Sequence, residues 1–333
     1  MINLINLSFF IYLYPNNKRN INTIILNIFS SIQSYFSAKK TIVTLGTFDG
    51  VHLGHQSIFN KLVSEAKKLN CESLVLTFFP HPRMILRQDD SIKLINTIEE
   101  KTLLLDNLGI NNLVIHPFDN VFSQMSGEDF VKQILVDTFH IQKIIIGYDH
   151  RFGKGGSCDI DDLIYFGTKY GFEVEQISAQ EINEVSISST KIRKALCLGD
   201  ITKANDFLGY PYFLNGVVVQ GKQLGRTIGF PTANIKVSAN YKLIPCEGVY
   251  LVKIEILDKE YFGMLNIGNN PTVNGQDQTI EVHILNFNQD IYDQEVKIVF
   301  LERIRDVIKF NSLSDLTLQL NKDKETALKY FNL

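Results

Sequence analysis

The pattern of predicted helices and strands changes once along this chain of 333 residues, near residues 208–211. Before this point, short β-rich segments alternate with segments whose apolar residues recur at helical spacing, which is typical of a parallel, doubly wound α/β sheet. After it, β-rich segments follow one another with only turn residues between them, which predicts an antiparallel β-barrel followed by a helix. Because the chain is also too long for one typical core, we predict two domains, over residues 41–207 and 208–333.

The predicted elements follow from hydrophobic spacing and from helix-capping residues. In the first half, the strands are Thr41–Leu45, Glu72–Phe79, Val114–His116 and Lys143–Ile146, and the helices are 54–69, 97–109, 126–140 and 188–198. In the second half, the strands are Gly216–Val219, Gly248–Leu257, Tyr261–Ile267, Thr279–Phe287 and Glu295–Leu301, and a last helix begins at Ser312 or Ser314 and runs towards Phe331.

Residues 1–40 differ in composition from the rest of the chain. They contain no Asp or Glu, and their only charged residues are Lys18, Arg19, Lys39 and Lys40. The apolar run Leu7–Tyr14 precedes these basic residues, whereas a secretory signal has its charges first. We therefore expect an unstructured extension or a misassigned start codon, with a targeting or docking segment as the alternative.

The overall composition indicates an ordinary globular protein and excludes several partners. The formal net charge of −3 gives no basic footprint for a nucleic acid, although local donors can still bind small anions. The 4 cysteines are scattered without a C-x-x-C pair, which argues against zinc and indicates reduced thiols in the cytoplasm. No apolar run is long enough to span a bilayer. We expect no nucleic-acid or membrane partner, and a monomer or weak oligomer.

The first chemical motif is a loop at Gly46–His55, which reads G-T-F-D-G-V-H-L-G-H. It connects a predicted strand to a predicted helix, where free N–H groups and the helix dipole favour phosphate. Gly46 and Gly50 permit close approach of the backbone to a ligand. His52 and His55 can face the same phosphates from the helix start and donate hydrogen bonds to them. Taken alone, an H-x-x-H pattern is more often two surface histidines.

A second glycine-rich loop lies in the other half of the chain. Its glycines are Gly221, Gly225 and Gly229. The segment that ends it contains Thr232 and Asn234, whose oxygens point the same way if the chain is extended. A hydroxyl and an amide oxygen suit Mg²⁺, which also keeps water and phosphate ligands. The alternative is a Gly- and Pro-rich turn that happens to end in Asn.

Two further segments of the second half, around Gly216–Lys222 and around Glu281, bear on its chemistry. The run Gly216–Lys222 nearly spells a P-loop, but Gln223 replaces the required Ser or Thr and no helix follows, so we reject a P-loop. Glu281 lies in the β-rich run Ile280–Ile284, and we expect it on the inward face of the barrel, where a carboxylate has no structural explanation. It is therefore the candidate general base.

Together, these motifs resemble those of the bifunctional bacterial riboflavin kinase / FAD synthetase family, over nearly all of residues 41–331. The resemblance implies a nucleotidyltransferase domain followed by a riboflavin kinase barrel. It implies that the barrel converts riboflavin to FMN with ATP, and that the first domain converts FMN to FAD with a second ATP and releases pyrophosphate. Both sites would use Mg²⁺, so the implied ligands are riboflavin, FMN, FAD, ATP and this cation.

The resemblance assigns residues to the first site. His52, His55 and Arg193 would act on the phosphates. The ATP and phosphate contacts would be Gly46, Phe48, Asp49, Gly50 and Gly54, together with Ser188, Ser189 and Thr190 of an I-S-S-T-x-I-R element. The flavin contacts would be Phe79, His81, Pro82, Asp149, Arg151 and Phe152. The run Gly155–Cys158 departs from the family, which usually has an Arg-containing stretch there.

The same resemblance assigns residues to the second site. Glu281 would take the proton from the riboflavin 5′-hydroxyl, and Thr232 and Asn234 would hold the metal. The ATP contacts would be Gly221, Gly225, Arg226 and Gly229, and the flavin contacts would be Asn266, Arg305 and Phe310. Two positions depart from the family pattern: Asn270 stands where many members have Arg, and Val307 stands where they have Glu.

Three alternatives remain open from the sequence. The chain could retain only one of the two activities, and the run Gly155–Cys158 is the feature that favours this reading. It could be a non-catalytic flavin-binding regulator, which predicts loss of Glu281, Thr232 or the two histidines. It could also adenylylate a different phosphate substrate, which the kinase-like half argues against.

Overall fold

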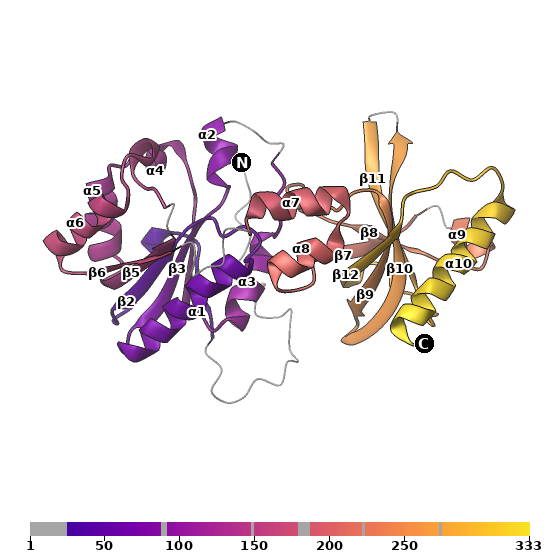
Figure 1. Cartoon of the computed structure of the whole chain (residues 1–333), viewed down its shortest axis with the longest axis horizontal. Helices are drawn as coiled ribbons and strands as arrows, with labels where there is room; N and C mark the ends of the chain where they lie inside the picture. Colours follow the sequence, from indigo (N-terminus) through magenta and orange to yellow (C-terminus); the bar gives the residue numbers. More distant parts are fainter. Residues whose placement is uncertain (1–24, 88–91, 148–149, 179–186, 222–223, 273–274) are drawn as a thin grey trace.

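The computed structural model describes residues 25–87, 92–147, 150–178, 187–221, 224–272 and 275–333. An α/β domain and a β-barrel lie side by side, with helices α7 (Ser189–Leu198) and α8 (Ile201–Leu208) between them (Figure 1). Among the described residues, no helix combines the length and the apolar composition needed to cross a membrane.

The α/β domain is built on a 6-stranded sheet in the order β1-β4-β3-β2-β5-β6, and every neighbouring pair is parallel. This confirms the predicted doubly wound α/β class. The strands are β1 (Asn27–Phe29), β2 (Thr41–Leu45), β3 (Glu72–Phe78), β4 (Asn112–His116), β5 (Ile141–Gly147) and β6 (Glu173–Ile177). The other helices are α1 (Leu53–Lys68), α2 (Pro82–Arg87), α3 (Ile98–Asn107), α4 (Asn120–Ser123), α5 (Gly127–Asp129) and α6 (Ile160–Tyr170).

The central strands have a core on both faces, which explains their continuous apolar sequence. In β2, Val43 and Leu45 belong to one hydrophobic cluster, and the intervening Ile42 belongs to another. Leu74 and Val75 of β3 divide between the same two clusters. All residues of β2 are buried, so its carboxyl end carries the following loop on a rigid support.

The segment before β2 corrects one expectation. Residues 25–40 are not an unstructured extension, because β1 pairs with β4 as an edge strand of the sheet and Tyr35 is only 6% exposed. The Tyr35 ring packs edge-on against Phe29 and Phe139. The short strand and the acid-poor composition concealed this role from sequence reasoning. The remaining part of the predicted extension, residues 1–24, lies outside the described residues.

Three other differences concern edge strands and helices. Sequence reasoning missed β6, because its E-V-E-Q-I sequence is that of a polar, partly exposed edge strand. It also missed α8. The single helix predicted for 126–140 is instead α5 followed by a π-helix at Phe130–Val136. In contrast, the capping box at Thr97 and the helix stop at Gly199 are confirmed.

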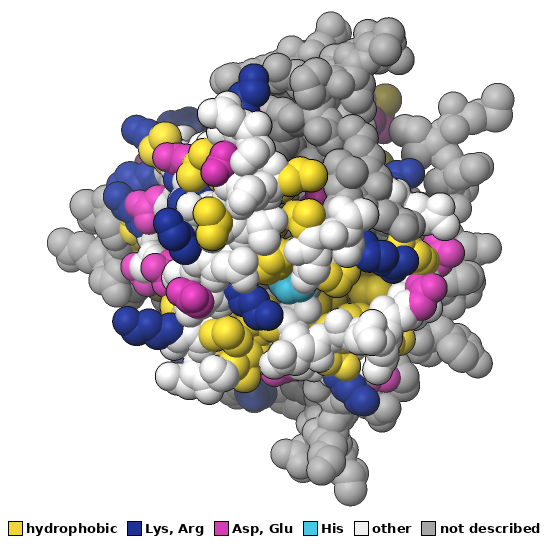
Figure 2. Space-filling model, turned by 90° about the vertical axis from the view of Figure 1, so that its right-hand side faces the viewer, with side chains coloured by type: hydrophobic (Ala, Val, Ile, Leu, Met, Phe, Trp, Pro, Cys, Tyr) yellow, Lys and Arg dark blue, Asp and Glu magenta, His cyan; other side chains and the backbone are white. Residues whose placement is uncertain are grey.

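The second domain is a closed antiparallel barrel in the order β10-β11-β8-β7-β12-β9, as predicted. Its strands are β7 (Phe213–Val219), β8 (Ala233–Lys236), β9 (Gly248–Ile256), β10 (Lys259–Thr272), β11 (Gly275–Ile284) and β12 (Glu295–Arg305). Helix α10 (Leu313–Phe331) begins at the predicted cap Ser312 and packs on the outer face of the barrel through Ala327 and Phe331. Figure 2 shows this end of the molecule, with a histidine among hydrophobic side chains.

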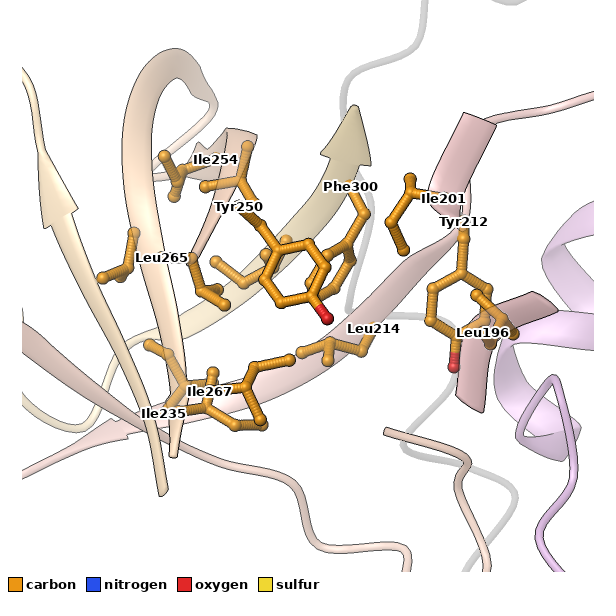
Figure 3. Close-up of a cluster of buried hydrophobic side chains, with 14 of the residues drawn as sticks. Leu196, Ile201, Tyr212, Leu214, Ile235, Tyr250, Ile254, Leu265, Ile267 and Phe300 are labelled. Carbon is orange, nitrogen blue, oxygen red and sulfur yellow. The ribbon is translucent and has the colours of Figure 1, made fainter. Parts of the chain in front are cut away.

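The core of the barrel continues into the helices that join the domains. Leu196 of α7 and Ile201 of α8 belong to the same buried cluster as Tyr212 and as Leu214 and Phe300 of the barrel (Figure 3). The predicted domain boundary at residue 208 therefore falls within a shared core, and its position stays a prediction.

The packing of Tyr35 gives a test of the corrected N-terminal segment. Replacing Tyr35 with Ala should lower the free energy of unfolding by about 3 kcal/mol, because a buried aromatic ring and its two edge contacts are lost. The neighbouring Phe36 is 81% exposed, so Phe36→Ala should have little effect and serves as the matched control. Urea unfolding measures both. Equal effects would mean that the segment does not pack as described.

Candidate active sites

The glycine-loop site is formed by Gly46–His55 and by the start of α7 at Ser188–Arg193. The loop leaves the carboxyl end of β2 and enters α1 at His52, whose side chain caps the helix by accepting a hydrogen bond from the His55 N–H. Gly50 has a φ of 93° and a Cβ there would lie 2.9 Å from the Ile95 side chain, so a larger residue would be both strained and crowded.

His52 and His55 stack on each other, with ring centroids 3.5 Å apart. Burial lowers the pKa of His52 to about 4 and holds the pKa of His55 well below its ordinary value, so both rings are neutral at pH 7. Because Nδ1 of His52 accepts the His55 N–H, the proton of its neutral ring resides on Nε2. That nitrogen can therefore donate a hydrogen bond to a phosphate oxygen.

Asp49 connects the two halves of the glycine-loop site. Its buried carboxylate accepts hydrogen bonds from the N–H groups of Ile95 and Asn96, at 2.9 and 3.4 Å, and forms an ion pair with Arg193 at 2.5 Å. Its backbone carbonyl accepts a hydrogen bond from the Ser189 hydroxyl at 2.8 Å. Burial raises the pKa of this carboxyl. The structure thus engages Asp49 with protein donors, and its predicted phosphate contact stays a prediction.

Some of the other residues that are predicted to contact the phosphates lie in the core, and others lie at the surface. Phe48 is buried and packs edge-on against His55 and Phe59, beneath the loop. Gly46 is half-buried above this ring, and Gly54 is buried inside α1. Ser188 caps α7, and Thr190 is exposed at the first turn. The helix start therefore contacts the loop through the Ser189 hydroxyl.

Sequence reasoning missed Lys101, a buried lysine of α3. Its ammonium donates hydrogen bonds to the Thr47 carbonyl at 2.6 Å and to the Thr77 hydroxyl at 3.4 Å. Burial lowers its pKa to about 8, opposed by the charge of Asp49. Nothing in the sequence distinguishes this lysine from a solvated one, because its partners lie in the glycine loop and on β3. It places a positive charge beneath the glycine loop.

The described residues that are predicted to contact the flavin in this domain have different surroundings. The ring of Phe79 contacts Tyr241, which comes from the barrel half of the chain. His81 is half-buried next to Pro82 at the start of α2, and its pKa falls to about 4 because of burial, with smaller effects of Lys101, Arg83 and Arg193.

The other predicted flavin contacts are Asp149, Arg151 and Phe152. Phe152 is buried in the core, with its ring tilted on that of Phe130, and Arg151 is exposed at 3.9 Å from Asp159. Asp149 lies outside the described residues. The run Gly155–Cys158, which departs from the family pattern, overlaps a turn of 3₁₀-helix at Lys154–Gly156. The flavin contacts assigned to these residues stay predictions.

The barrel site consists of Thr232, Asn234, Asn266 and Glu281. The Thr232 hydroxyl donates a hydrogen bond to Glu281 at 3.4 Å. Asn234 of β8 and Asn266 of β10 lie directly opposite Glu281 on its two neighbouring strands. Side chains that are paired in register share one face of a sheet, so the four polar groups converge.

The expected inward position of Glu281 is wrong. Ile280 and Val282, on either side of it, belong to the hydrophobic core of the barrel, so Glu281 lies on the outer face. The narrow barrel is filled by apolar side chains and would leave a carboxylate without partners. On the same outer face, His283 Nδ1 donates a hydrogen bond to the Pro231 carbonyl, 2.8 Å away.

The glycine-rich loop approaches this cluster closely. A Cβ at Gly221 would lie 2.0 Å from the amide nitrogen of Asn234, so only glycine fits there. Gly225 and the exposed Arg226 lie on the short helix α9 (Leu224–Thr227), and Gly229 follows with a φ of 82°. A cavity of about 330 Å³, lined by Asn234 and Thr279 among others, opens beside the cluster.

The donors of the barrel site fit Mg²⁺. Hydroxyl and amide oxygens are hard ligands, and Asn234 lines the cavity. Within the described part of the chain, no group of 3 or more His, Cys, Asp and Glu side chains could hold a metal ion. A cation here would therefore depend on Thr232, Asn234 and substrate phosphates.

Two predicted flavin contacts lie near α10. Arg305 forms a two-pronged ion pair with the buried Asp323, with a shortest distance of 2.6 Å, and so anchors the helix to β12. Phe310 is half-buried in the segment between them. The guanidinium of Arg305 is committed to the protein, and its predicted flavin contact stays a prediction.

A loop that leads from a parallel strand into a helix start, joined to a barrel that gathers hydroxyl, amide and carboxylate oxygens, is typical of a two-domain transferase that handles nucleotide phosphates. The family model described as FAD synthetase matches residues 36–191, and the one described as riboflavin kinase matches residues 208–331. The chain belongs to the family of bifunctional riboflavin kinase/FMN adenylyltransferases.

Relatives from several bacteria carry this description. The protein of Haemophilus influenzae is 38% identical over 87% of this chain and 94% of its own length. That of Bacillus subtilis is 38% identical over 88% of this chain and 93% of its own length. A crystal structure from Streptococcus pneumoniae, described as a macrolide-efflux protein, has a TM-score of 0.84 at 33% identity and covers 91% of this chain and 99% of its own. Its efflux description differs from those of the two relatives.

The buried His52 gives a prediction for the pH dependence of stability. In the unfolded chain its pKa is near 6.5, whereas in the folded chain it is about 4. Between these values the unfolded state binds a proton that the folded state does not, so stability falls as the pH falls. Lowering the pH from 7 to 5 should cost about 2 kcal/mol through this residue.

Urea unfolding at both pH values measures this effect. His52→Gln should remove part of the pH dependence, whereas His140→Asn, at an exposed position, should leave it unchanged. The same pH dependence in the wild type and His52→Gln would contradict the buried, neutral state of His52.

Proposed function

We propose that this chain synthesises both flavin cofactors, with riboflavin phosphorylated at the barrel site and FMN adenylylated at the glycine-loop site. The observation that carries the proposal is the convergence of Thr232, Asn234 and Glu281 on one outer face of the barrel, separate from the paired histidines and Arg193. Each domain has its own cluster of polar side chains, as a phosphoryl transfer followed by an adenylyl transfer requires.

At the barrel site, Glu281 accepts the proton of the riboflavin 5′-hydroxyl. The hydroxyl oxygen forms a bond to the γ-phosphorus of ATP, and the bond from this phosphorus to the bridging oxygen breaks, so that ADP leaves with the electron pair. The Thr232 hydroxyl, which donates to Glu281, holds the carboxylate in place. The glycine loop at 221–229 brings backbone N–H groups towards the phosphates.

Thr232 and Asn234 are the residues that would hold Mg²⁺. When bound, this cation neutralises charge on the ATP phosphates. Asn234 keeps its amide in place through β8, where it pairs with Glu281 on one side and Val219 on the other. The neighbouring cavity gives room for the phosphates beside it.

At the glycine-loop site, an FMN phosphate oxygen forms a bond to the α-phosphorus of ATP, and pyrophosphate leaves. The FMN phosphate is already ionised, so no general base is needed. The neutral His52 ring donates from Nε2, and the N–H groups at the start of α7 receive the pyrophosphate. Arg193, held by Asp49, directs its remaining N–H groups at the same charge.

The oligomeric state and the location of the protein are part of the same proposal. We infer a monomer or weak oligomer in the cytoplasm, where flavin cofactors and ATP meet. The 4 cysteines are all free in the structure, which agrees with a reducing compartment.

The two sites can be separated by substitution. Glu281→Gln removes the proton acceptor and should slow riboflavin phosphorylation by about a hundredfold or more, while FMN is still converted to FAD. Chromatography of reactions started from riboflavin or from FMN, with ATP and Mg²⁺, measures both steps. The control is Glu295→Gln, an exposed carboxylate on β12. A parallel loss of both activities in a folded protein would contradict two independent sites.

His55→Ala is the complementary substitution. It removes one member of the stacked histidine pair and should slow FAD formation from FMN by about a hundredfold or more, while riboflavin phosphorylation continues. The same chromatography measures the outcome, with exposed His140→Ala as the control. FAD synthesis at the normal rate would remove His55 from the reaction. FMN as the sole product of the unchanged protein would instead support the alternative of a single retained activity.

A further inference from the structure

The segment between β8 and β9 belongs to the barrel half of the chain, yet it pairs with the α/β domain. Leu94, which precedes α3, forms an isolated parallel bridge with Lys242. The Leu94 N–H donates to the Tyr241 carbonyl at 2.7 Å, and the Leu243 N–H donates to the Leu94 carbonyl at 2.8 Å. This pairing carries the side chain of Lys242 into the junction between the domains.

The Lys242 side chain is fully buried there. Its ammonium donates three hydrogen bonds, to the Ile95 carbonyl at 2.7 Å, to Glu100 at 2.5 Å and to the Phe213 carbonyl at 2.8 Å. It also lies 4.5 Å from the ring centroid of Tyr212. A buried ammonium is costly unless all its protons are satisfied. These acceptors satisfy all three, so the position of Lys242 and its partners is closely defined.

Two of these partners lead directly to the glycine-loop site. The carbonyl of Ile95 accepts from Lys242, and the N–H groups of Ile95 and Asn96 donate to the Asp49 carboxylate. Glu100, which pairs with Lys242, also accepts the Thr97 N–H. The segment from Ile95 to Thr97 is thus held from the barrel side and in turn holds Asp49.

Asp49 connects the segment from Ile95 to Thr97 with Arg193 and Ser189 of the glycine-loop site. Its carboxylate positions Arg193, and its carbonyl positions Ser189. A second contact reinforces the route, because the Tyr210 hydroxyl donates to the Gly50 carbonyl at 2.6 Å. The hydrogen bonds of Lys242 join it to Ile95, Glu100 and Phe213, and none of them involves Glu281.

We propose that Lys242, in the riboflavin kinase half of the chain, is a positioning residue for FMN adenylylation. It acts through Ile95 and Asp49 on Arg193, so the glycine-loop site is complete only when the barrel is docked on it. This inference rests on the proposed function of the glycine-loop site.

The experiment must separate positioning from loss of folding. Lys242→Met alone leaves the buried charge of Glu100 without its cationic partner and can unfold the junction. The main variant is therefore Lys242→Met with Glu100→Gln, which removes both charges, retains the side-chain volumes and keeps an acceptor for the Thr97 N–H. Glu100→Gln alone retains the bond from Lys242 to Ile95. Lys93→Met is the matched control, because Lys93 is an exposed junction lysine that donates to the Asn240 carbonyl.

The measurements are kcat and KM for FMN adenylylation, the rate of riboflavin phosphorylation, and Tm, all on the full chain. The double variant should lose kcat for adenylylation by about tenfold to a hundredfold, with KM for FMN and the phosphorylation rate unchanged. Glu100→Gln alone and Lys93→Met should retain adenylylation. In an Arg193→Lys background the double variant should cause a smaller further loss, because both changes act on one group.

Normal adenylylation by the folded double variant would overturn the inference, as would an equal loss of both activities that follows Tm. A full, additive loss in the Arg193→Lys background would also overturn it, since Lys242 would not act through Arg193. A wild-type chain that makes FMN but no FAD would overturn the proposed function of the glycine-loop site, and this inference with it.

Discussion

A carboxylate that is removed from water needs a partner for each of its oxygens, because the cost of burying an unpaired charge exceeds most single contributions to stability. Asp49 is only 3% exposed, and its partners come from residues 46 and 144 positions further along the chain. The folded state therefore has to bring the glycine loop, the segment before α3 and the start of α7 together. The geometry of the glycine-loop site follows from satisfying this one group.

Sequence reasoning succeeded where a local signal decides the structure. The strand β2 is β-rich and mostly apolar because both its faces are buried, and the caps at Thr97 and Ser312 satisfy N–H groups within one turn. It failed where tertiary contacts decide. The strand β1 has only 3 residues and is held by packing of Tyr35 on a distant phenylalanine, and β6 is too polar to show a strand pattern.

The same distinction applies to the sites. The motifs identify groups that are close in sequence, such as the stacked histidines and the pair Thr232 and Asn234. They do not reveal Lys101 or Lys242, because a lysine in a helix or a loop is usually solvated and only its distant acceptors show otherwise. They also misplaced Glu281, since the alternation of the strand fixes which residues share a face but not which face is inside.

Alternation along β11 gives its residues two separate sets of neighbours. Ile280, Val282 and Ile284 fill the interior of the barrel, whereas Glu281 and His283 face outwards and contact Thr232 and Pro231. A substitution in the first set changes core volume, and one in the second changes polar contacts, with little overlap between them. The barrel can therefore diverge during evolution in its interior without losing the reacting groups, and its ligand preference can drift on the outer face without loss of the scaffold.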